Sequence, residues 1–429
     1  MTAFDAGLSG RLVLGRKQLF ALFVRLLGAA LQILSTWAVV RALAPEDAGV
    51  YFRGFLIALG FSTLLRGKYE LYLARHIIGR PDPSTDVSTG ALLARIARRL
   101  LLRSTLLCAV LLIITADLDI QAPQLQTVLQ TYLPFVLAIP AVSIASLIGE
   151  ALRAANRTLG IVVASFTVNW AILLTAALAP KGAPLALYSW AFLFGSLLAA
   201  AALGGLAWRI FPTSLAESSC PISRESLHAI DSLELIGLAR GAQLWGPLCI
   251  LSVLAAPLQI AQYAVAARIA TVMDFFLPAL NLTAAGSVSM IGADPARRMR
   301  SVRQLATAML FSSVLVGPSL LFAPATLAPF GYPYQSHLPV YMLLLGAQWI
   351  SGTGRPAVRL AAVAWESRRI GLVVGLGAGA SIIVCSLGVS AYGAVAAAGA
   401  SLIGAVVLNG AAILLALSSR SGEYATGKA

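Results

Sequence analysis

The stretch "APEDAGVY", residues 44–51, decides how the sequence is organised, because a similar stretch, "APLQIAQY", occupies residues 256–263. In both stretches Ala-Pro is followed by a small residue four positions after the Pro and by Tyr six positions after it. The two stretches begin 212 residues apart, close to half of the 429-residue chain. This spacing predicts that the chain arose by duplication.

A second pair of segments supports the duplication. The segment "ALRAANRTLGIVV", which starts at Ala151, resembles "AVAWESRRIGLVV", which starts at Ala362. The alignment pairs Arg157 with Arg368. Two matches at nearly the same offset favour an internal repeat over chance similarity.

The composition is that of a membrane protein. Hydrophobic residues make up 59% of the chain and charged residues only 11%, and the mean hydropathy is +0.85. Apolar runs long enough to cross a hydrocarbon core of about 30 Å as helices recur along the chain. We therefore expect an all-α polytopic membrane protein with about twelve transmembrane helices. The expected spans are Gln18–Val40, Val50–Arg66, Leu100–Ala116, Val128–Leu147, Leu159–Ala179, Leu185–Ala207, Leu238–Ala256, Gln262–Val288, Leu305–Ala323, Leu338–Ile350, Ile370–Ser390 and Gly393–Leu417.

The segment after the sixth span divides these helices into two sets of six. Residues 1–208 are expected to form one six-helix lobe and residues 238–429 the other. Residues 209–237 are expected to form a cytoplasmic linker with a short amphipathic helix. Because each half contains an even number of spans, both halves start on the same side of the membrane and form parallel repeats.

The distribution of Lys and Arg predicts the orientation of the chain. Of the 31 basic residues, 26 are assigned to one side of the predicted topology, including Arg66, Arg103 and Arg240 near the ends of spans; two fall on the other side, and Arg25, Arg53 and Arg268 are counted within spans. Lys and Arg are retained in cytoplasmic loops, so both termini are expected to be cytoplasmic. The same distribution explains the net charge of +14 without nucleic-acid binding.

Other residues argue against an enzyme or a metal site. The longest loop on the non-cytoplasmic side, Pro324–His337, has 14 residues and leaves no room for a soluble catalytic domain. The four Cys and three His residues are scattered along the chain without metal-ligand spacing. We therefore expect neither catalysis nor a cofactor.

Four segments resemble a known family. The turn "RALAPEDAGVY" and the later segments "QYAVAARIATVMDFFLPALN", "PFGYPYQSHLPVYMLLLGAQWIS" and "SAYGAVAAAGASLIGAVV" are similar to parts of polysaccharide exporters and Wzx-type lipid-linked oligosaccharide flippases. That family belongs to the superfamily that also holds multidrug extruders and flippases of peptidoglycan precursor. One departure is the charged stretch with Arg66, Lys68 and Glu70 at the end of the second span, where many relatives are less charged.

The resemblance implies a transport mechanism. Two six-helix lobes would alternate around a central cavity and move a polyprenyl-diphosphate-linked oligosaccharide across the bacterial inner membrane. The lipid bilayer and the lipid-linked glycan are then the expected partners, together with glycan-assembly proteins. Transport would be coupled to protons, sodium or the membrane potential. A multidrug or small-solute extruder on the same scaffold is the alternative, and a membrane-embedded glycan polymerase or ligase is a third hypothesis.

Cations within the spans are the candidate ligands for a diphosphate. A cation at the centre of an inserting helix costs about 2.5–3.5 kcal/mol, so such residues are retained for function or reach a polar surface by snorkelling. Arg25 shares a helical face with Gln32 and Thr36, which predicts a polar stripe through the first span. The candidate substrate-binding residues are Arg25, Gln32, Arg53, Arg240, Gln243 and Arg268.

Three further features bear on coupling, motion and packing. Asp274 is a candidate for coupling to an ion, and a structural bond between helices is its alternative role. Gly246 and Pro247 form a candidate hinge, or else a static kink, because Pro lacks a backbone N–H. Small residues at Gly371, Gly375 and Gly379 predict close helix packing along the eleventh span.

Overall fold

The computed structural model describes residues 16–78, 87–121, 125–155, 159–180, 182–211, 234–271, 322–364 and 367–418. These residues form helices, and no strand occurs among them. The long helices are α1 (Arg16–Ala42), α2 (Pro45–Ile78), α3 (Val87–Gln121), α4 (Leu125–Ala154), α5 (Leu159–Leu178), α6 (Leu185–Ile210), α9 (Glu234–Leu254), α10 (Pro257–Thr271), α15 (Leu338–Ala364), α16 (Ser367–Tyr392) and α17 (Ala394–Ser418). Three short helices, α13 (Ala323–Leu327), η1 (Ala328–Phe330) and α14 (Tyr332–Gln335), precede α15.

The helices have the length and composition of membrane spans. Within the described ranges, five helical segments have at least 18 residues and are apolar enough to cross a bilayer: Pro45–Glu70, Thr131–Leu152, Leu185–Ile210, Arg369–Tyr392 and Ala394–Leu414. Three shorter apolar segments lie in α1, α5 and α15. The prediction of an all-α polytopic fold is confirmed.

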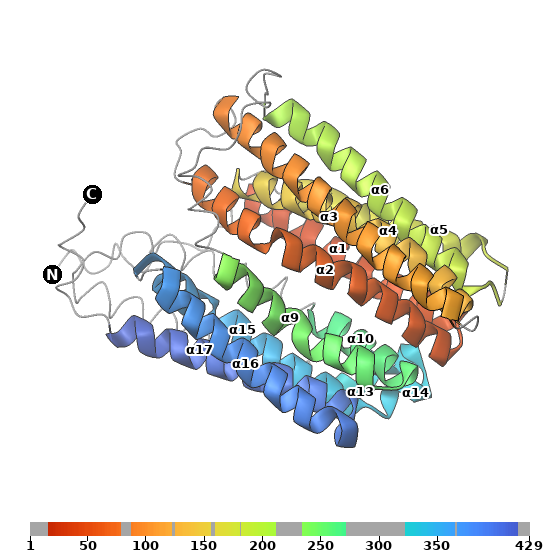
Figure 1. The fold of residues 1–429 in the computed structure, drawn as a ribbon. Coiled ribbons are helices and arrows are strands. Elements are labelled where there is room, and N and C mark those ends of the chain that lie inside the picture. The colour runs from red at the N-terminus through yellow and green to blue at the C-terminus, as the bar shows by residue number, and fades with distance from the viewer. Residues whose placement is uncertain are drawn as a thin grey trace.

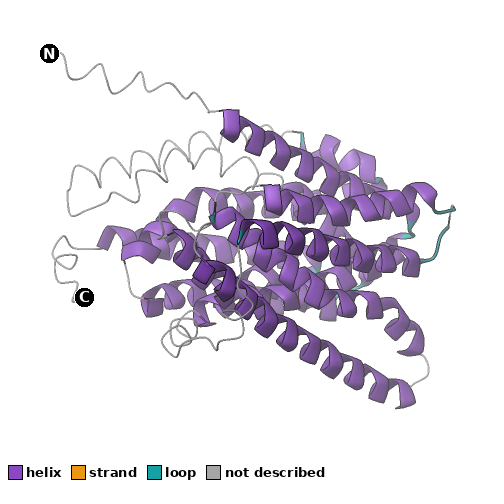
Figure 2. Cartoon of the chain, turned by 90° about the horizontal axis from the view of Figure 1, so that it is seen from above, coloured by secondary structure: helices purple, strands orange, loops and turns teal. Residues whose placement is uncertain are grey.

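The helices pack in two groups that meet along one seam. Helices α1–α6 contact one another, and α9, α10 and α15–α17 form the second group (Figure 1). In the view from above, the long helices run roughly along a common direction (Figure 2). Helix α2 of the first group packs against α9 and α10, and α1 also contacts α10. Residues 212–233, which include the predicted amphipathic linker helix, lie outside the described residues.

The bundle has two distinct ends. We call the end with the short connections at residues 43–44, 179–184, 255–256 and 393 the turn end, which also holds α13, η1 and α14. The opposite end, where α2, α6 and α15 finish and α9 and α16 begin, is the basic end. Pro45 and Pro257 are each the first residue of a helix at the turn end. The missing N–H of Pro costs nothing there, because the first N–H groups of a helix have no partner within the helix.

The buried core joins the two groups of helices at the turn end. One cluster of buried residues contains Val39 and Phe52 from the first group together with Ile260 and Val265 from the second. Nearer the basic end the described clusters are separate. One contains Tyr69 with residues of α3, α4 and α6, and a small one lies between α9 and α16. The seam is therefore most extensively packed at the turn end.

Two sequence predictions need correction. Gly375 and Gly379 do not mediate close packing, because a Cβ built at either position meets no atom within 4 Å. The close contact lies instead at Gly377, where a Cβ would be 3.1 Å from the carbonyl oxygen of Gly404 on α17. The predicted loop at residues 324–337 also contains the short helices α13, η1 and α14. Gly377 is two residues from Gly375 and from Gly379, about 200° around the helix, so it lies on the opposite face of α16, which the four-residue spacing alone did not indicate.

Candidate functional site

The candidate site is built around Arg268 in α10, the helix that follows the second Ala-Pro turn. Every residue from Ile260 to Ala266 is buried, and Arg268 is itself only 8% exposed. Arg268 follows Pro257 by 11 residues, which places it about 16 Å along the helix at 1.5 Å per residue. That is about half of a hydrocarbon core of about 30 Å. A cation is therefore buried at mid-depth in the bundle.

Arg268 reaches across the seam to the first group of helices. Its Nη1 donates a hydrogen bond of 3.0 Å to Oγ1 of Thr36 on α1. The Thr36 hydroxyl in turn donates to the carbonyl oxygen of Gln32 over 2.7 Å. Thr36 can accept from Arg268 because its own proton is directed to Gln32. The polar stripe predicted on the first span thus meets the cation of the second lobe.

Two aromatic rings of α2 hold the guanidinium group. The Cζ atom of Arg268 lies 4.1 Å from the ring centroid of Phe55 and 5.6 Å from that of Phe52. A cation within about 6 Å of an aromatic face is attracted by the ring quadrupole, and more strongly where water is excluded. The two rings and Thr36 fix the guanidinium between α1, α2 and α10.

The guanidinium is not fully satisfied. Nη2 of Arg268 is buried and has no hydrogen-bond partner. The hydroxyl group of Tyr51, the Tyr of the first Ala-Pro stretch, is also buried without a partner. No carboxylate among the described residues bonds to Arg268. Buried polar groups are normally paired, so the site retains donor capacity that an anionic ligand can use.

Hydrogen bonds close the turn end above Arg268. Nη2 of Arg53 donates to the carbonyl oxygen of Ala255 over 3.2 Å, and Nε1 of Trp37 donates to that of Pro329 over 3.0 Å. Both bonds join the two groups of helices. In addition, Nε2 of Gln262 donates to the carbonyl oxygen of Pro333 over 2.7 Å. The residues from η1 to α14 are therefore tied to α1 and α10.

The predicted site residues do not all gather at Arg268. Gln32 contributes its backbone carbonyl to the site, and Arg53 belongs to the turn-end closure. Nε2 of Gln243 donates to the carbonyl oxygen of Gly404 over 3.3 Å, so this amide links α9 to α17. The side chains of Arg25 and Arg240, and Asp274 as a whole, lie outside the described residues.

The predicted hinge is packed within the second group of helices. A Cβ built at Gly246 would lie 3.0 Å from Cγ1 of Ile382 on α16. The carbonyl oxygen of Pro247 accepts from Sγ of Cys385 on the same helix over 3.3 Å. Helix α9 runs through both residues from Glu234 to Leu254. Gly246 and Pro247 therefore shape the contact between α9 and α16.

Sequence reasoning missed the aromatic part of the site. Phe52 and Phe55 are three residues apart, a spacing that places both on one face of α2, but such pairs are common in apolar spans. Their role depends on α10, which follows them by about 200 residues in the sequence. Within the described ranges, no group of three or more His, Cys, Asp or Glu is arranged to hold a metal ion.

Comparison with known proteins identifies the fold. No protein-family model and no curated protein sequence matches the chain. Among solved structures, an inward-closed lipid II flippase MurJ superimposes with a TM-score of 0.69 at 12% identity, covering 92% of this chain and 87% of MurJ. A multidrug resistance MATE family transporter of the MOP superfamily gives 0.62 in its inward-facing conformation, at 16% identity and over 95% of this chain and 100% of its own.

The outward-facing conformation of a MATE family transporter gives a similar result. Its TM-score is 0.64 at 16% identity, over 94% of this chain and 95% of the transporter. The likeness extends over nearly the whole of each chain, and so includes both groups of helices and their order. The chain therefore has the fold of the MOP superfamily transporters, a multi-pass membrane fold of two parallel helical lobes.

Proposed function

We propose that this protein translocates a polyprenyl-diphosphate-linked oligosaccharide across the bacterial inner membrane by alternating access. The observation that carries the proposal is the position of Arg268, buried at mid-depth between the lobes with Nη2 unpartnered. In this proposal the basic end faces the cytoplasm, as the distribution of Lys and Arg predicts. The diphosphate passes the seam while the lipid tail stays in the bilayer.

A diphosphate suits the donors that Arg268 offers. The planar guanidinium presents several N–H groups in a fixed fork and binds phosphate oxygens in a bidentate manner. Phe52 and Phe55 fix its position, so little ordering is needed when the ligand arrives. Burial strengthens the attraction, because charges interact more strongly where water is excluded. The site thus favours an anion with several oxygen acceptors.

The same contacts argue against a cationic substrate, which is the kind of substrate expected for many multidrug extruders. A cation at the seam would be repelled by Arg268, and no described carboxylate compensates its charge. The face of Phe55, which would otherwise attract a cation, is already occupied by the guanidinium at 4.1 Å. The extruder alternative therefore has less support from this site than anion transport.

The membrane potential favours the proposed direction. With the cytoplasm negative, moving an anion outward is favourable by about 2.3 kcal/mol per charge per 100 mV. This term supplies a driving force without a bound coupling ion. Asp274 remains the candidate residue for additional coupling to protons or sodium.

Ligand binding to the purified protein in nanodiscs tests the proposal. We expect a polyprenyl-diphosphate-linked oligosaccharide to bind the natural protein and to bind the Arg268→Ala variant about tenfold more weakly or worse, since a hydrogen bond to a charged group is worth about 1.5–3 kcal/mol. Arg209→Ala, an exposed cation of α6, is the matched control and should bind normally. Preferential binding of a lipophilic cation such as tetraphenylphosphonium would support the extruder instead.

A further inference from the structure

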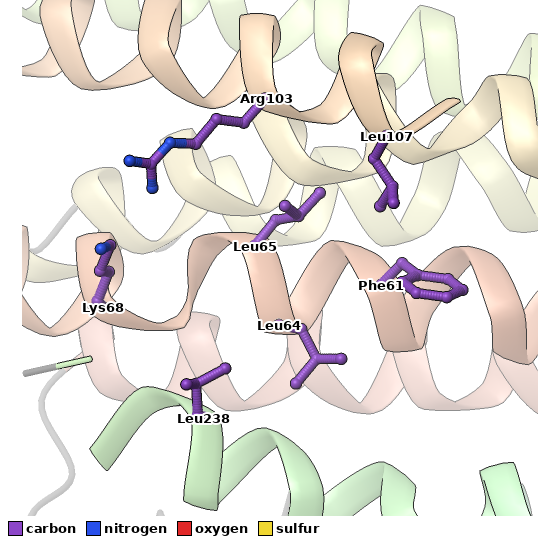
Figure 3. Close-up of a pocket in the computed structure, with 7 residues that line it drawn as sticks. All are labelled: Phe61, Leu64, Leu65, Lys68, Arg103, Leu107 and Leu238. Carbon is purple, nitrogen blue, oxygen red and sulfur yellow. The ribbon is translucent and has the colours of Figure 1, made fainter. Parts of the chain in front are cut away.

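A groove lies on α2 away from Arg268, between α3 of the first lobe and α9 of the second. Its volume is about 280 Å³, and Figure 3 shows the side chains that surround it. The lining residues are Phe61, Leu64, Leu65, Lys68, Arg103, Leu107 and Leu238. Helix α2 forms the floor, α3 contributes Arg103 and Leu107, and α9 contributes Leu238. The groove is thus bordered by both lobes.

Two cations stand at one end of this groove. The Nζ atom of Lys68 and the Cζ atom of Arg103 each lie 5.8 Å from the ring centroid of Tyr69. Lys68 is only 7% exposed, whereas the side chain of Arg103 is exposed. In Figure 3 both charged groups lie at the same end of the groove, toward the basic end of α2. Both side chains bring positive charge to this end of the groove, which attracts an anion.

The rest of the groove is apolar and follows the direction of the membrane normal. Phe61 precedes Lys68 by seven residues, so the apolar part extends about 10 Å along α2 at 1.5 Å per residue. Leu64 and Leu238 are exposed to 36% and 46%, so the groove is open at the surface of the bundle. A cationic end near the membrane surface and an apolar channel toward the midplane match the two parts of a phospholipid.

We propose that this groove binds an anionic glycerophospholipid from the leaflet at the basic end of the protein. The phosphate of the headgroup lies between Lys68 and Arg103, and one acyl chain follows Leu65, Leu107 and Phe61. A volume of about 280 Å³ accommodates the phosphate and the first part of one chain, because it is near the lower limit of small-molecule pockets. The proposal does not depend on the transported substrate.

A lipid in this groove would link the two lobes next to their contact at the basic end. There a Cβ built at Gly67 of α2 would lie 3.2 Å from Cα of Gly237 of α9. The bound lipid would touch Leu238, the next residue of α9, and Arg103 of α3. Binding therefore stabilises the arrangement in which α2 and α9 are packed together, because a ligand favours the conformation that binds it better.

Binding measurements in nanodiscs of defined composition test the proposal. Phosphatidylglycerol is titrated into phosphatidylcholine nanodiscs, and both the retained lipid and the thermal unfolding midpoint are measured. For the natural protein we expect a retained phosphatidylglycerol molecule and a rise in the midpoint. The Lys68→Gln, Arg103→Gln double variant should bind it about tenfold more weakly, since each basic residue near a membrane surface attracts anionic lipid. Arg103→Gln alone should give an intermediate loss, and it should fold normally because its side chain is exposed.

Arg98→Gln is the matched control, since Arg98 is an exposed cation of α3 that does not line the groove. It should retain the lipid and the stabilisation. Equal retention of phosphatidylglycerol by all variants would overturn the proposal. So would equal stabilisation by inorganic phosphate, or displacement of phosphatidylglycerol from this groove by the polyprenyl diphosphate carrier. None of these outcomes bears on whether Arg268 binds the transported substrate.

Discussion

Gly49 of α2 lies directly against the backbone of Pro257, the first residue of α10. A Cβ built at Gly49 would be 1.9 Å from the carbonyl oxygen of Pro257. Both residues belong to the duplicated Ala-Pro stretches, so the two copies of one motif meet where the lobes join at the turn end. Only a residue without a side chain permits this approach. The contact therefore gives the glycine of the first copy a specific role in closing the turn end.

Gly49→Ala is expected to open the turn end. The methyl group would overlap a backbone atom that cannot move aside cheaply, and overpacking of this kind costs about 1–3 kcal/mol. Spin labels at Ala44 and Ala256, both exposed at the turn end, should report a longer and broader distance distribution in the variant. Gly375→Ala, where a Cβ meets no atom within 4 Å, is the control and should leave the distribution unchanged. An unchanged distance in Gly49→Ala would contradict the closing role.

Gly237→Ala is expected to act on the opposite end. A Cβ at Gly237 would lie 2.8 Å from the backbone nitrogen of Lys68, so this substitution loosens α9 from α2 at the basic end. If the two ends open alternately, the labels at Ala44 and Ala256 should then show a single short distance. A lengthening like that of Gly49→Ala would show that the ends are not coupled in this way.

Acid is expected to weaken the structure around His337, the residue before α15. Partial burial lowers the pKa of His337 below its usual value of 6.5. The unfolded chain therefore binds a proton more readily, and the stability contributed by neutral His337 is present above pH 6.5 and is lost as pH falls below it. The protection factors of amides in residues 322–337, which correct hydrogen exchange for its intrinsic pH dependence, should fall from pH 7 to pH 5. His337→Gln, which does not titrate, should show a smaller fall in protection; an equal fall would exclude His337 as the cause.

Cysteine labelling in a background without native cysteines tests the orientation. Tyr332 is 81% exposed at the turn end, and Arg209 is exposed at the basic end. A membrane-impermeant reagent added outside intact cells should label Tyr332→Cys and should reach Arg209→Cys only after the membrane is permeabilised. The reverse pattern would place the basic end outside, against the distribution of Lys and Arg.

The sequence was sufficient to predict the helices because each span is a long apolar run with its own signal. It placed a turn before the second and eighth spans but began these spans at Val50 and Gln262, whereas α2 and α10 begin at Pro45 and Pro257, since Pro suits the first turn of a helix. It did not predict that Gly49 would touch Pro257. That contact depends on how two helices from different halves of the chain approach each other, and hydropathy carries no information about such an approach.

The sequence predicted only part of the candidate site, because hydropathy carries no information about contacts between helices. A cation in an apolar span is conspicuous, so Arg268 was selected, and the stripe on α1 included its partner Thr36. The role of Phe55 was not predictable, since a Phe in a span is ordinary until a cation is placed 4.1 Å from its ring. Gln243 was selected together with Arg240 because the pair begins the seventh span in a place that roughly corresponds to the polar stripe of the first span; in the structure its amide bonds to Gly404 within its own lobe.

Translocation by the purified protein in proteoliposomes tests the proposed function most directly. The assay follows the arrival of a polyprenyl-diphosphate-linked oligosaccharide at the opposite leaflet, normalised to correctly folded protein. The natural protein and Arg209→Ala should transport it, Arg268→Lys should retain part of the rate because it keeps the charge without the planar fork, and Arg268→Ala should lose about tenfold or more. Full transport by folded Arg268→Ala, or transport of a lipophilic cation in place of the lipid-linked glycan, would contradict the proposal.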